Sequence, residues 1–420
     1  MQVARTNIVI KPDAKRVLLR PFDLGDEQRV AKVVRRVIAL DDQQVKGELE
    51  NILAGFDGRH RNVEERFRQR FEEITRLARV DDNLIEGHKL LIGAYFCSEY
   101  SVEAAALFNP SMVWHPDQSG VLQGSKRFVL TLRATGEGHI SSIEFRTGVV
   151  SEDGHISMDQ PNGFVSAPVT VASAGKEAEN EMAFLQSSQL AERVIFPVSE
   201  LERNGIEDAR FVQFRNGVRQ PTYYATYTAY DGHNINSRLL QTDDFVNFRV
   251  VTLQGQEVRN KGMALFPRKV GKHYAMISRQ DNENLFIMFS DEVTRWDEKQ
   301  LLLEPAYPWE FVQIGNCGSP METEAGWLLL THGVGPMRQY AVGAVLLDLE
   351  NPTRVVGRLK CPLLRPDESE REGYVPNVVY SCGSQIHNGK LIIPYAMSDV
   401  ASSFAMVDLD DLLSELTSSG

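Results

Sequence analysis

A short acidic turn, Glu207-Asp208-Ala209-Arg210, carries residue types that proton-transfer chemistry uses. It lies directly before an apolar run, residues 211–214, that is typical of a strand. A carboxyl group fixed at a strand edge beside a guanidinium group is a candidate general acid, because the cation lowers its pKa and burial raises it. The same residues are also typical of a solvated turn, so the motif acquires meaning only from its partners elsewhere in the chain.

Three later residues are candidate anion binders. Lys261 follows Arg259 and Asn260 shortly before an apolar stretch, Arg279 ends a strand-like run, and His332 ends another. A guanidinium group offers a planar pair of donors that fits phosphate. Lys261 could equally belong to a solvated run of surface charges. His332 could equally be a buried core histidine whose ring nitrogens are hydrogen-bonded within the protein.

Two earlier segments also hold polar residues that strand propensity does not explain. The first is Asn109-Pro110-Ser111, which is also a common way to start a turn. The second is Arg133, which is followed by a glycine-rich stretch, residues 136–138. Glycines let a backbone approach a ligand closely, although a hairpin uses them equally well.

Composition restricts the partners of the chain. Its 420 residues carry a formal net charge of -12, which argues against nucleic acid as a partner and requires a local basic pocket for any bound anion. No apolar run approaches the roughly 20 residues that cross a bilayer, and the first residues lack a signal-peptide core, so no membrane partner is expected. The four cysteines are scattered and the nine histidines show no metal-ligand spacing. These features predict a cytoplasmic protein with reduced thiols.

Residues 1–95 and 96–420 differ in the spacing of their apolar residues. After a strand-like start, residues 25–91 carry apolar stripes at helical spacing, such as Val30, Val33, Val34 and Val37. We expect residues 1–95 to form a strand and a helical extension of three or four helices. Two roles are open for this extension: an oligomerisation element, or a cap over one end of the main domain at the acceptor side of a site there.

From residue 96 onward the sequence is typical of an all-β domain. Short apolar runs alternate with turns rich in Gly, Asp, Asn and Pro. A weak repeat relates Thr242-Asp243-Asp244 to Ser290-Asp291-Glu292. A period of about 50 residues with about four strands per unit is typical of propeller blades, and polar groups at the inner strand ends of a propeller line its central channel.

Taken together, these segments resemble glycoside hydrolase family 130, the inverting β-mannoside phosphorylases and their hydrolytic relatives. The resemblance covers roughly residues 100 to 400. It rests on the order and spacing of Asn109-Pro110-Ser111, Glu207-Asp208-Ala209-Arg210, Lys261 before Leu265-Phe266-Pro267, Arg279, Gly326-Trp327-Leu328, His332-Gly333-Val334, and Asp399 after Tyr395. It implies a five-bladed β-propeller, with the N-terminal α-helical extension outside the family core.

The resemblance also implies a reaction. Inorganic phosphate attacks the anomeric carbon of a terminal β-mannosyl unit of a manno-oligosaccharide, and α-mannose 1-phosphate leaves. Asp208 is the implied general acid, acting through the 3-hydroxyl of the sugar, and no metal or organic cofactor is expected. The other implied contacts are phosphate binding by Lys261, Arg279 and His332, sugar binding by Asn109, Ser111, Arg133 and Asp399, and a border of the phosphate pocket by Tyr340.

Two departures from the family pattern keep alternatives open. Ala209 replaces a proline, and Glu322 stands about where many phosphorylases have a phosphate-binding lysine. A carboxylate at 322 repels phosphate, and the alternative reaction is that of an inverting β-mannosidase for β-1,2 links with Glu322 as its base. Because Lys261 and Arg279 are retained, phosphorolysis is the favoured interpretation. A non-catalytic propeller that binds carbohydrate or protein is the alternative from a different class. Linkage and acceptor depend on loops around the acceptor subsite.

Overall fold

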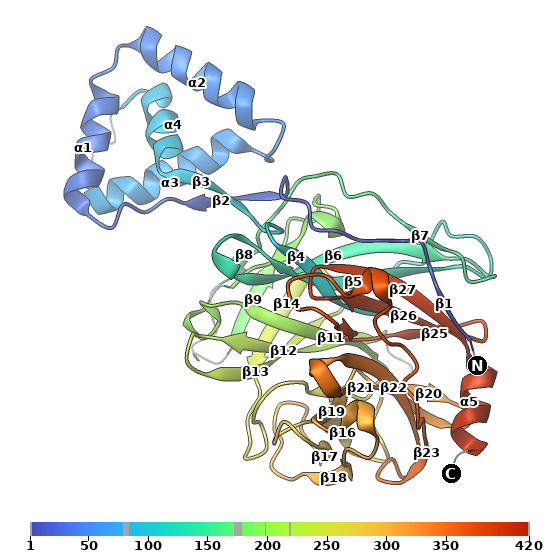
Figure 1. Cartoon of the computed structure of the whole chain (residues 1–420). Helices are drawn as coiled ribbons and strands as arrows, with labels where there is room; N and C mark the ends of the chain where they lie inside the picture. Colours follow the sequence, from blue (N-terminus) through green and yellow to red (C-terminus); the bar gives the residue numbers. More distant parts are fainter. Residues whose placement is uncertain (1, 79–83, 172–178, 198, 218–219, 419–420) are drawn as a thin grey trace. The chain divides into compact units, whose positions relative to one another are not determined.

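The computed structural model describes residues 2–78, 84–171, 179–197, 199–217 and 220–418 (Figure 1). The chain divides into two compact units. One, called here the sheet unit, consists of Met1–Asp13, Glu103–Pro161 and Ser166–Gly420. The other, the helical unit, consists of Ala14–Val102 and Asn162–Val165. None of the described helices is long and apolar enough to cross a membrane.

The described residues of the helical unit form four helices and a two-stranded sheet. They are α1 (Glu27–Ile38), α2 (Asp42–Phe56), α3 (Val63–Ala78), α4 (Glu86–Tyr95), β2 (Val17–Pro21) and β3 (Cys97–Ser101). Asp26 caps α1 by accepting from the Gln28 backbone N–H, and Asp41 begins α2 with a capping box. Val30, Val34 and Val37 are buried on one face of α1, as their spacing predicts.

Among the residues that the structure describes, the sheet unit has five larger sheets, and this part of the chain is mostly β with few helices. The first has β4 (Ala106–Trp114), β5 (Lys126–Thr135), β6 (Ser141–Val150), β7 (Ile156–Met158) and β10 (Val194–Ile195). The second has β8 (Val169–Val171), β9 (Glu179–Ala183), β11 (Ile206–Phe214), β12 (Thr222–Tyr230), β13 (Ile235–Thr242) and β14 (Asn247–Thr252). The third has β15 (Ala264–Leu265), β16 (Tyr274–Ser278), β17 (Leu285–Ser290) and β18 (Gln300–Leu303).

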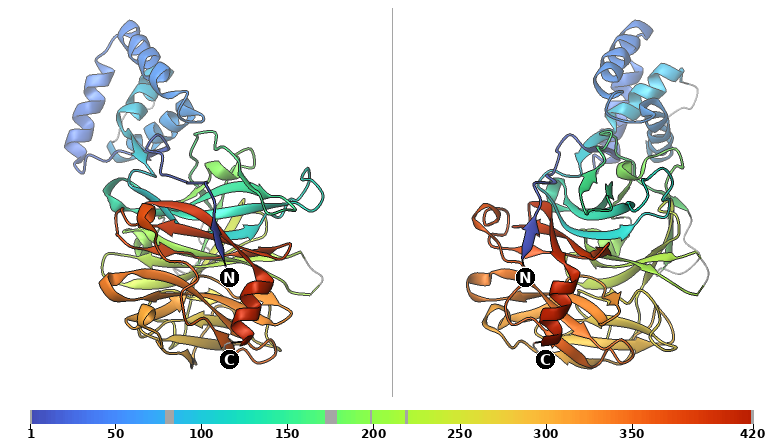
Figure 2. Two further views of the ribbon diagram at one scale, coloured as in Figure 1. Left: turned by 45° about the vertical axis from the view of Figure 1, so that its right-hand side comes forward. Right: turned by 90° about the vertical axis from the view of Figure 1, so that its right-hand side faces the viewer.

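Two more sheets complete the sheet unit. The fourth has β19 (Gln313–Asn316), β20 (Met321–Thr323), β21 (Gly326–Val334), β22 (Tyr340–Leu347) and β23 (Val355–Arg358). The fifth has β24 (Val379–Tyr380), β25 (Gln385–His387), β26 (Lys390–Met397), β27 (Ala401–Asp408) and the N-terminal strand β1 (Val3–Arg5). Val3 lies opposite Val407, so the two ends of the chain meet in one sheet (Figures 1 and 2). The last helix, α5 (Leu409–Ser418), buries Leu412 and Leu416.

Apolar clusters join the five sheets in pairs. Separate clusters lie between the first and second sheets, the second and third, the third and fourth, and the fourth and fifth. A further cluster packs Leu107 and Phe128 of the first sheet with Ile392 and Phe404 of the fifth. Each sheet is therefore buried against two others, which holds the ends of β4, β11, β19 and β24 in fixed positions relative to one another.

Candidate active site

A pocket of about 140 Å³ in the sheet unit is lined by residues from all five larger sheets or the loops beside them. It brings together eight of the residues predicted from the sequence: Asn109, Arg133, Asp208, Lys261, Arg279, His332, Tyr340 and Asp399. These residues span almost 300 positions of the chain, and the packing of the sheets is what places them around one cavity.

Irregular backbone directs two of these side chains. Asn109 and Asp208 lie where the strand register shifts, at bulges in β4 and β11. Both adopt left-handed backbone conformations, with φ of 50° and 54°. Asn and Asp tolerate this conformation better than other non-glycine residues, and a bulge re-aims a side chain that regular pleating would turn elsewhere. Strained backbone of this kind is commonly kept at functional sites.

Asp208 is a buried carboxylate surrounded by cations. Its Oδ1 accepts a hydrogen bond of 2.6 Å from Asn109 Nδ2 and lies 3.7 Å from Arg133 Nη1. Burial raises the pKa of Asp208, but the charges of Arg133, Arg210 and Lys261 outweigh burial and bring the pKa below its ordinary value. The protein alone therefore holds Asp208 ionised, and a proton on this group requires a change in the surrounding charge.

Arg279 is a buried cation that no described carboxylate neutralises. It is 7% exposed, and its Nε has no hydrogen-bond partner among the described residues. Its Nη1 lies 3.4 Å from Nε2 of His332. A buried guanidinium group without a counter-ion is costly, so its place at the pocket wall indicates a site built for an anion.

The tautomer of His332 follows from its contacts. Its Nδ1 lies 3.1 Å from the Asn316 carbonyl oxygen, which only accepts, so Nδ1 carries the proton and Nε2 presents a lone pair to Arg279. Burial, followed by the charges of Arg279 and Arg210, lowers the pKa of His332 well below its ordinary value. His332 is thus neutral in the protein alone, and it orients Arg279 rather than adding positive charge.

Glu207 connects two of the other cations. Its carboxylate accepts from Arg133 Nη2 at 2.9 Å and from Lys261 Nζ at 3.4 Å. The opening motif of the sequence therefore contributes both acids: Asp208 points to the pocket, and Glu207 holds two pocket cations in place.

The structure adds pocket residues that the sequence did not single out: Gln313, Arg338, Val375, Val378 and Tyr380. Arg338 adopts a left-handed conformation in the hairpin between β21 and β22, directly before the strand of Tyr340. Its proximity in sequence to His332 and Tyr340 was the available signal. Tyr380 accepts a 2.6 Å hydrogen bond from buried Arg210, and no local pattern distinguishes it.

Two predicted residues lie outside the pocket. The Ser111 hydroxyl is buried and accepts from the Phe211 backbone N–H at 3.0 Å, so it fastens β4 to β11 instead of facing a sugar. Glu322 lines a different cavity, of about 200 Å³, where Arg268 donates to both of its carboxylate oxygens. That pairing lowers the pKa of Glu322. The geometry thus gives Glu322 no place beside Asp208 as a catalytic base.

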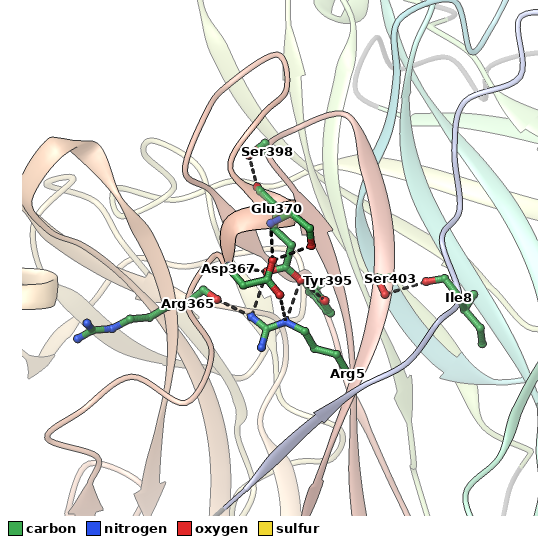
Figure 3. A network of polar contacts seen from close by, with 9 residues as sticks. Arg5, Ile8, Arg365, Asp367, Glu370, Tyr395, Ser398 and Ser403 are labelled. Carbon is green, nitrogen blue, oxygen red and sulfur yellow. Dashed lines mark hydrogen bonds and ion pairs between the residues drawn. The ribbon is translucent and has the colours of Figure 1, made fainter.

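A polar network holds the turn that carries Asp399 (Figure 3). The buried Glu370 carboxylate accepts from Arg5 Nε at 2.9 Å and from the Tyr395 hydroxyl. The Ser398 hydroxyl donates to the Glu370 carbonyl oxygen at 2.5 Å. Asp399 follows with φ of 55°. The N-terminal strand therefore helps to fix a pocket carboxylate through Glu370 and Ser398.

Asp399→Asn is expected to stabilise the protein at neutral pH. Burial and then the charge of Asp208 raise the pKa of Asp399 to about 6. A pKa raised on folding favours the folded state below the unfolded pKa of about 3.9, and this contribution is lost as pH rises through 6. Asn tolerates the same backbone conformation and carries no charge. The free energy of unfolding should therefore rise by about 3 kcal/mol at pH 7.5 relative to the parent protein.

Denaturant unfolding at pH 4 and pH 7.5 measures this effect. The advantage of the Asn variant should shrink toward pH 4, where Asp399 is protonated in the folded state and about half protonated in the unfolded state. An equal difference at both pH values would show that the Asp399 charge is not the cause.

Comparisons with known proteins identify the family of the chain. The model of glycoside hydrolase family 130, described as beta-1,4-mannooligosaccharide phosphorylase, matches residues 178–418. The 1,2-beta-oligomannan phosphorylase of Thermoanaerobacter sp. (strain X514) is 33% identical over 221 residues, which are 51% of this chain and 72% of that protein. The beta-1,2-mannobiose phosphorylase of Listeria innocua is 30% identical over 231 residues, 53% of this chain and 63% of that protein.

Solved structures show a similar fold. The structure of the Listeria innocua beta-1,2-mannobiose phosphorylase with beta-1,2-mannobiose matches with a TM-score of 0.55 and 21% identity, covering 76% of this chain and 93% of that one. At this level of identity the likeness supports a shared fold. The family model, by contrast, matches the sequence over more than half of the chain. The chain belongs to glycoside hydrolase family 130.

Proposed function

We propose that the protein cleaves a terminal β-mannosidic bond of a manno-oligosaccharide with inorganic phosphate, inverts the anomeric carbon and releases α-mannose 1-phosphate. The observation that carries the proposal is a buried acid, Asp208, in the same pocket as a buried cation, Arg279, that has no described counter-ion. The names of its phosphorylase relatives support the same chemistry.

Inverting cleavage needs an acid on one face of the sugar and a nucleophile on the other. Phosphate is itself the nucleophile, so the protein must supply cations rather than a base on the far face. Arg279, oriented by His332, and Lys261 meet this need, with Arg338 as a further cation at the wall. Tyr340 stacks on His332 with ring centroids 5.8 Å apart and borders this cationic side.

Phosphate binding also prepares the acid. The charges that hold the pKa of Asp208 down include Arg133, Arg210 and Lys261. A phosphate anion beside Lys261 offsets part of that positive charge, so the pKa of Asp208 rises when phosphate is bound. Asp208 then carries the proton that passes through the 3-hydroxyl of the sugar to the leaving oxygen. Binding of the nucleophile thus also favours the protonated, acid form of Asp208.

The remaining pocket groups suit a mannosyl unit. Asn109 donates its Nδ2 hydrogen to Asp208, and its buried Oδ1 has no partner among the described residues. Because Asn109 lines the pocket, we expect its amide group to contact a sugar hydroxyl once it reorients toward the ligand. The Asp399 carboxylate and the Arg133 guanidinium group provide an acceptor and donors on the same pocket wall.

We also propose that the five larger sheets are blades of a five-bladed propeller with the pocket at one mouth of its channel. The apolar clusters that join each sheet to the next, and the first to the fifth, support this arrangement. A crystal structure in which the first and fifth sheets are not neighbours would contradict it.

Product analysis tests the function. Incubation with β-1,2-mannobiose should yield α-mannose 1-phosphate only when phosphate is present. Free mannose formed at the same rate with and without phosphate would instead indicate an inverting β-mannosidase. No turnover of any β-mannoside would leave a propeller that binds carbohydrate or protein without catalysis.

Glu322→Ala is expected to leave phosphorolysis within about twofold of the parent rate. The Glu322 carboxylate is bound by Arg268 in a separate cavity, so its removal changes neither the acid nor the cations of the pocket. The rate of mannose 1-phosphate release at saturating phosphate measures the effect. A loss of mannose 1-phosphate release as large as that expected for Asp208→Asn would show that Glu322 takes part in phosphorolysis. A loss of free mannose release alone would indicate a base for hydrolysis.

Three further properties belong to the proposal. The helical unit mediates homo-oligomerisation, which its exposed apolar side chains support: Phe22, Ile38, Phe56, Ile85 and Tyr95. The reaction needs phosphate as co-substrate and no metal or organic cofactor. The protein acts in the cytoplasm, consistent with cysteines that are all free thiols. Light scattering, chelator titration and fractionation of cells test these properties in turn.

A further inference from the structure

Exposed apolar side chains gather next to residues that line the catalytic pocket. Tyr374 is 68% exposed and directly precedes the lining residue Val375. Met337, which is 90% exposed, precedes Arg338 but lines a separate cavity beside Trp309. Val312 is also exposed and directly precedes the lining residue Gln313, with exposed Phe311 one position earlier. Exposed apolar residues are ordinary when scattered, so a binding role for Tyr374 needs a second observation beside its exposure.

Tyr374 forms an aromatic pair at this rim. Its ring centroid lies 5.9 Å from that of exposed His139, with 31° between the ring planes. His139 lies in the hairpin between β5 and β6, and β5 carries the pocket residue Arg133. The pair therefore joins a loop of the first sheet to the segment that enters β24 of the fifth sheet, beside the pocket mouth.

The backbone around Tyr374 is fixed. Val375 donates its N–H to the Ser398 carbonyl oxygen at 3.1 Å. Gly373 packs so closely on that same oxygen that a Cβ at 373 would lie 2.3 Å from it. Ser398 in turn is bound to Glu370. The ring is thus presented on a segment that is anchored on both sides, so little ordering cost accompanies ligand contact.

We propose that Tyr374 and His139 form the acceptor-side platform of the enzyme, on which the sugar beyond the cleaved bond stacks. This inference rests on the proposed function. The mannosyl unit inside the pocket meets polar groups such as Asp208, Asn109 and Asp399. A sugar outside the pocket meets the aromatic rim, and a pyranose ring presents a face of C–H groups that packs on an aromatic ring. Tyr combines such an apolar body with a polar tip.

The reverse reaction, from α-mannose 1-phosphate and an acceptor mannoside, separates the two sides of the site. Tyr374→Ala should raise the KM for the acceptor about five- to tenfold, the loss of an aromatic contact and its buried area. The KM for α-mannose 1-phosphate should stay within twofold. Tyr374→Phe should behave like the parent protein, because the ring rather than the hydroxyl makes the contact. Leu122→Ala removes an apolar side chain that is 82% exposed and does not line the pocket, and it serves as the matched control.

The affinity for β-1,2-mannotriose, measured by calorimetry in phosphate-free buffer, tests the platform independently of the proposed phosphorolysis. A parent protein that binds the trisaccharide but never forms mannose 1-phosphate would refute the proposed phosphorolysis. In that case a weaker Kd in Tyr374→Ala still supports the platform, and an equal Kd overturns it. If phosphorolysis occurs, an unchanged acceptor KM in Tyr374→Ala overturns the platform alone.

Discussion

Asp208→Asn should lower the rate of phosphorolysis about a thousandfold, within the range that general acids contribute. Asn keeps the shape of the side chain and tolerates the left-handed backbone at 208, so the bulge in β11 should persist. It has no carboxyl proton to give, and the leaving sugar must depart without protonation. The measurement is the initial rate of α-mannose 1-phosphate release at saturating phosphate and β-mannobiose.

The same variant has a second expected property. Removing the negative charge at 208 leaves Arg133, Arg210 and Lys261 less neutralised, so phosphate should bind at least as tightly as in the parent. Thermal unfolding close to that of the parent serves as the control for folding. A variant that retains a near-normal rate would show that the proton comes from another group.

Arg279→Ala should raise the KM for phosphate at least about 30-fold, since loss of one partner of a buried charge-assisted contact costs about 2–5 kcal/mol. Arg279 is buried at the pocket wall and pairs with no described carboxylate, so its interaction energy is directed at the ligand. The KM for the manno-oligosaccharide should change much less, because Asn109, Asp208 and Asp399 remain. Initial rates over a matrix of both substrate concentrations separate the two constants.

Two controls sharpen this result. Arg279→Lys keeps the charge but loses the planar pair of donors, so its KM for phosphate should fall between those of the parent and Arg279→Ala. Arg215→Ala removes an exposed arginine from the other cavity and should change neither constant. Equal KM values for phosphate in the parent and Arg279→Ala would place the anion elsewhere.

Many of the pocket residues could be predicted because they are polar residues next to the ends of apolar, strand-like runs in the sequence. Lys261, Arg279 and His332 lie before or at the ends of strands, and the packing of the sheets brings such ends together. The case of Ser111 shows what spacing does not reveal. The bulge at Asn109 decides which neighbouring side chains face the pocket, and Ser111 turns instead to the Phe211 backbone.

Pairing between strands that are far apart in the sequence could not be predicted from local patterns either. The Val and Phe stripes of α1 and α3 follow from helical periodicity alone. By contrast, β1 pairs with β27 across almost the whole chain, and Arg5 reaches Glu370 only because of that pairing. Glu322 lies in a short strand, and its carboxylate is bound by Arg268. This pairing cannot be predicted from the residues that neighbour Glu322 in the sequence.

The most direct test of the central claim is a crystal structure of the Asp208→Asn variant with phosphate and a β-manno-oligosaccharide. The phosphate should accept hydrogen bonds from Arg279 and Lys261 on one face of the terminal mannosyl ring, with the side chain at 208 on the opposite face. Phosphate bound away from these two cations, or on the same face of the ring as residue 208, would contradict the inverting phosphorolysis proposed for this pocket.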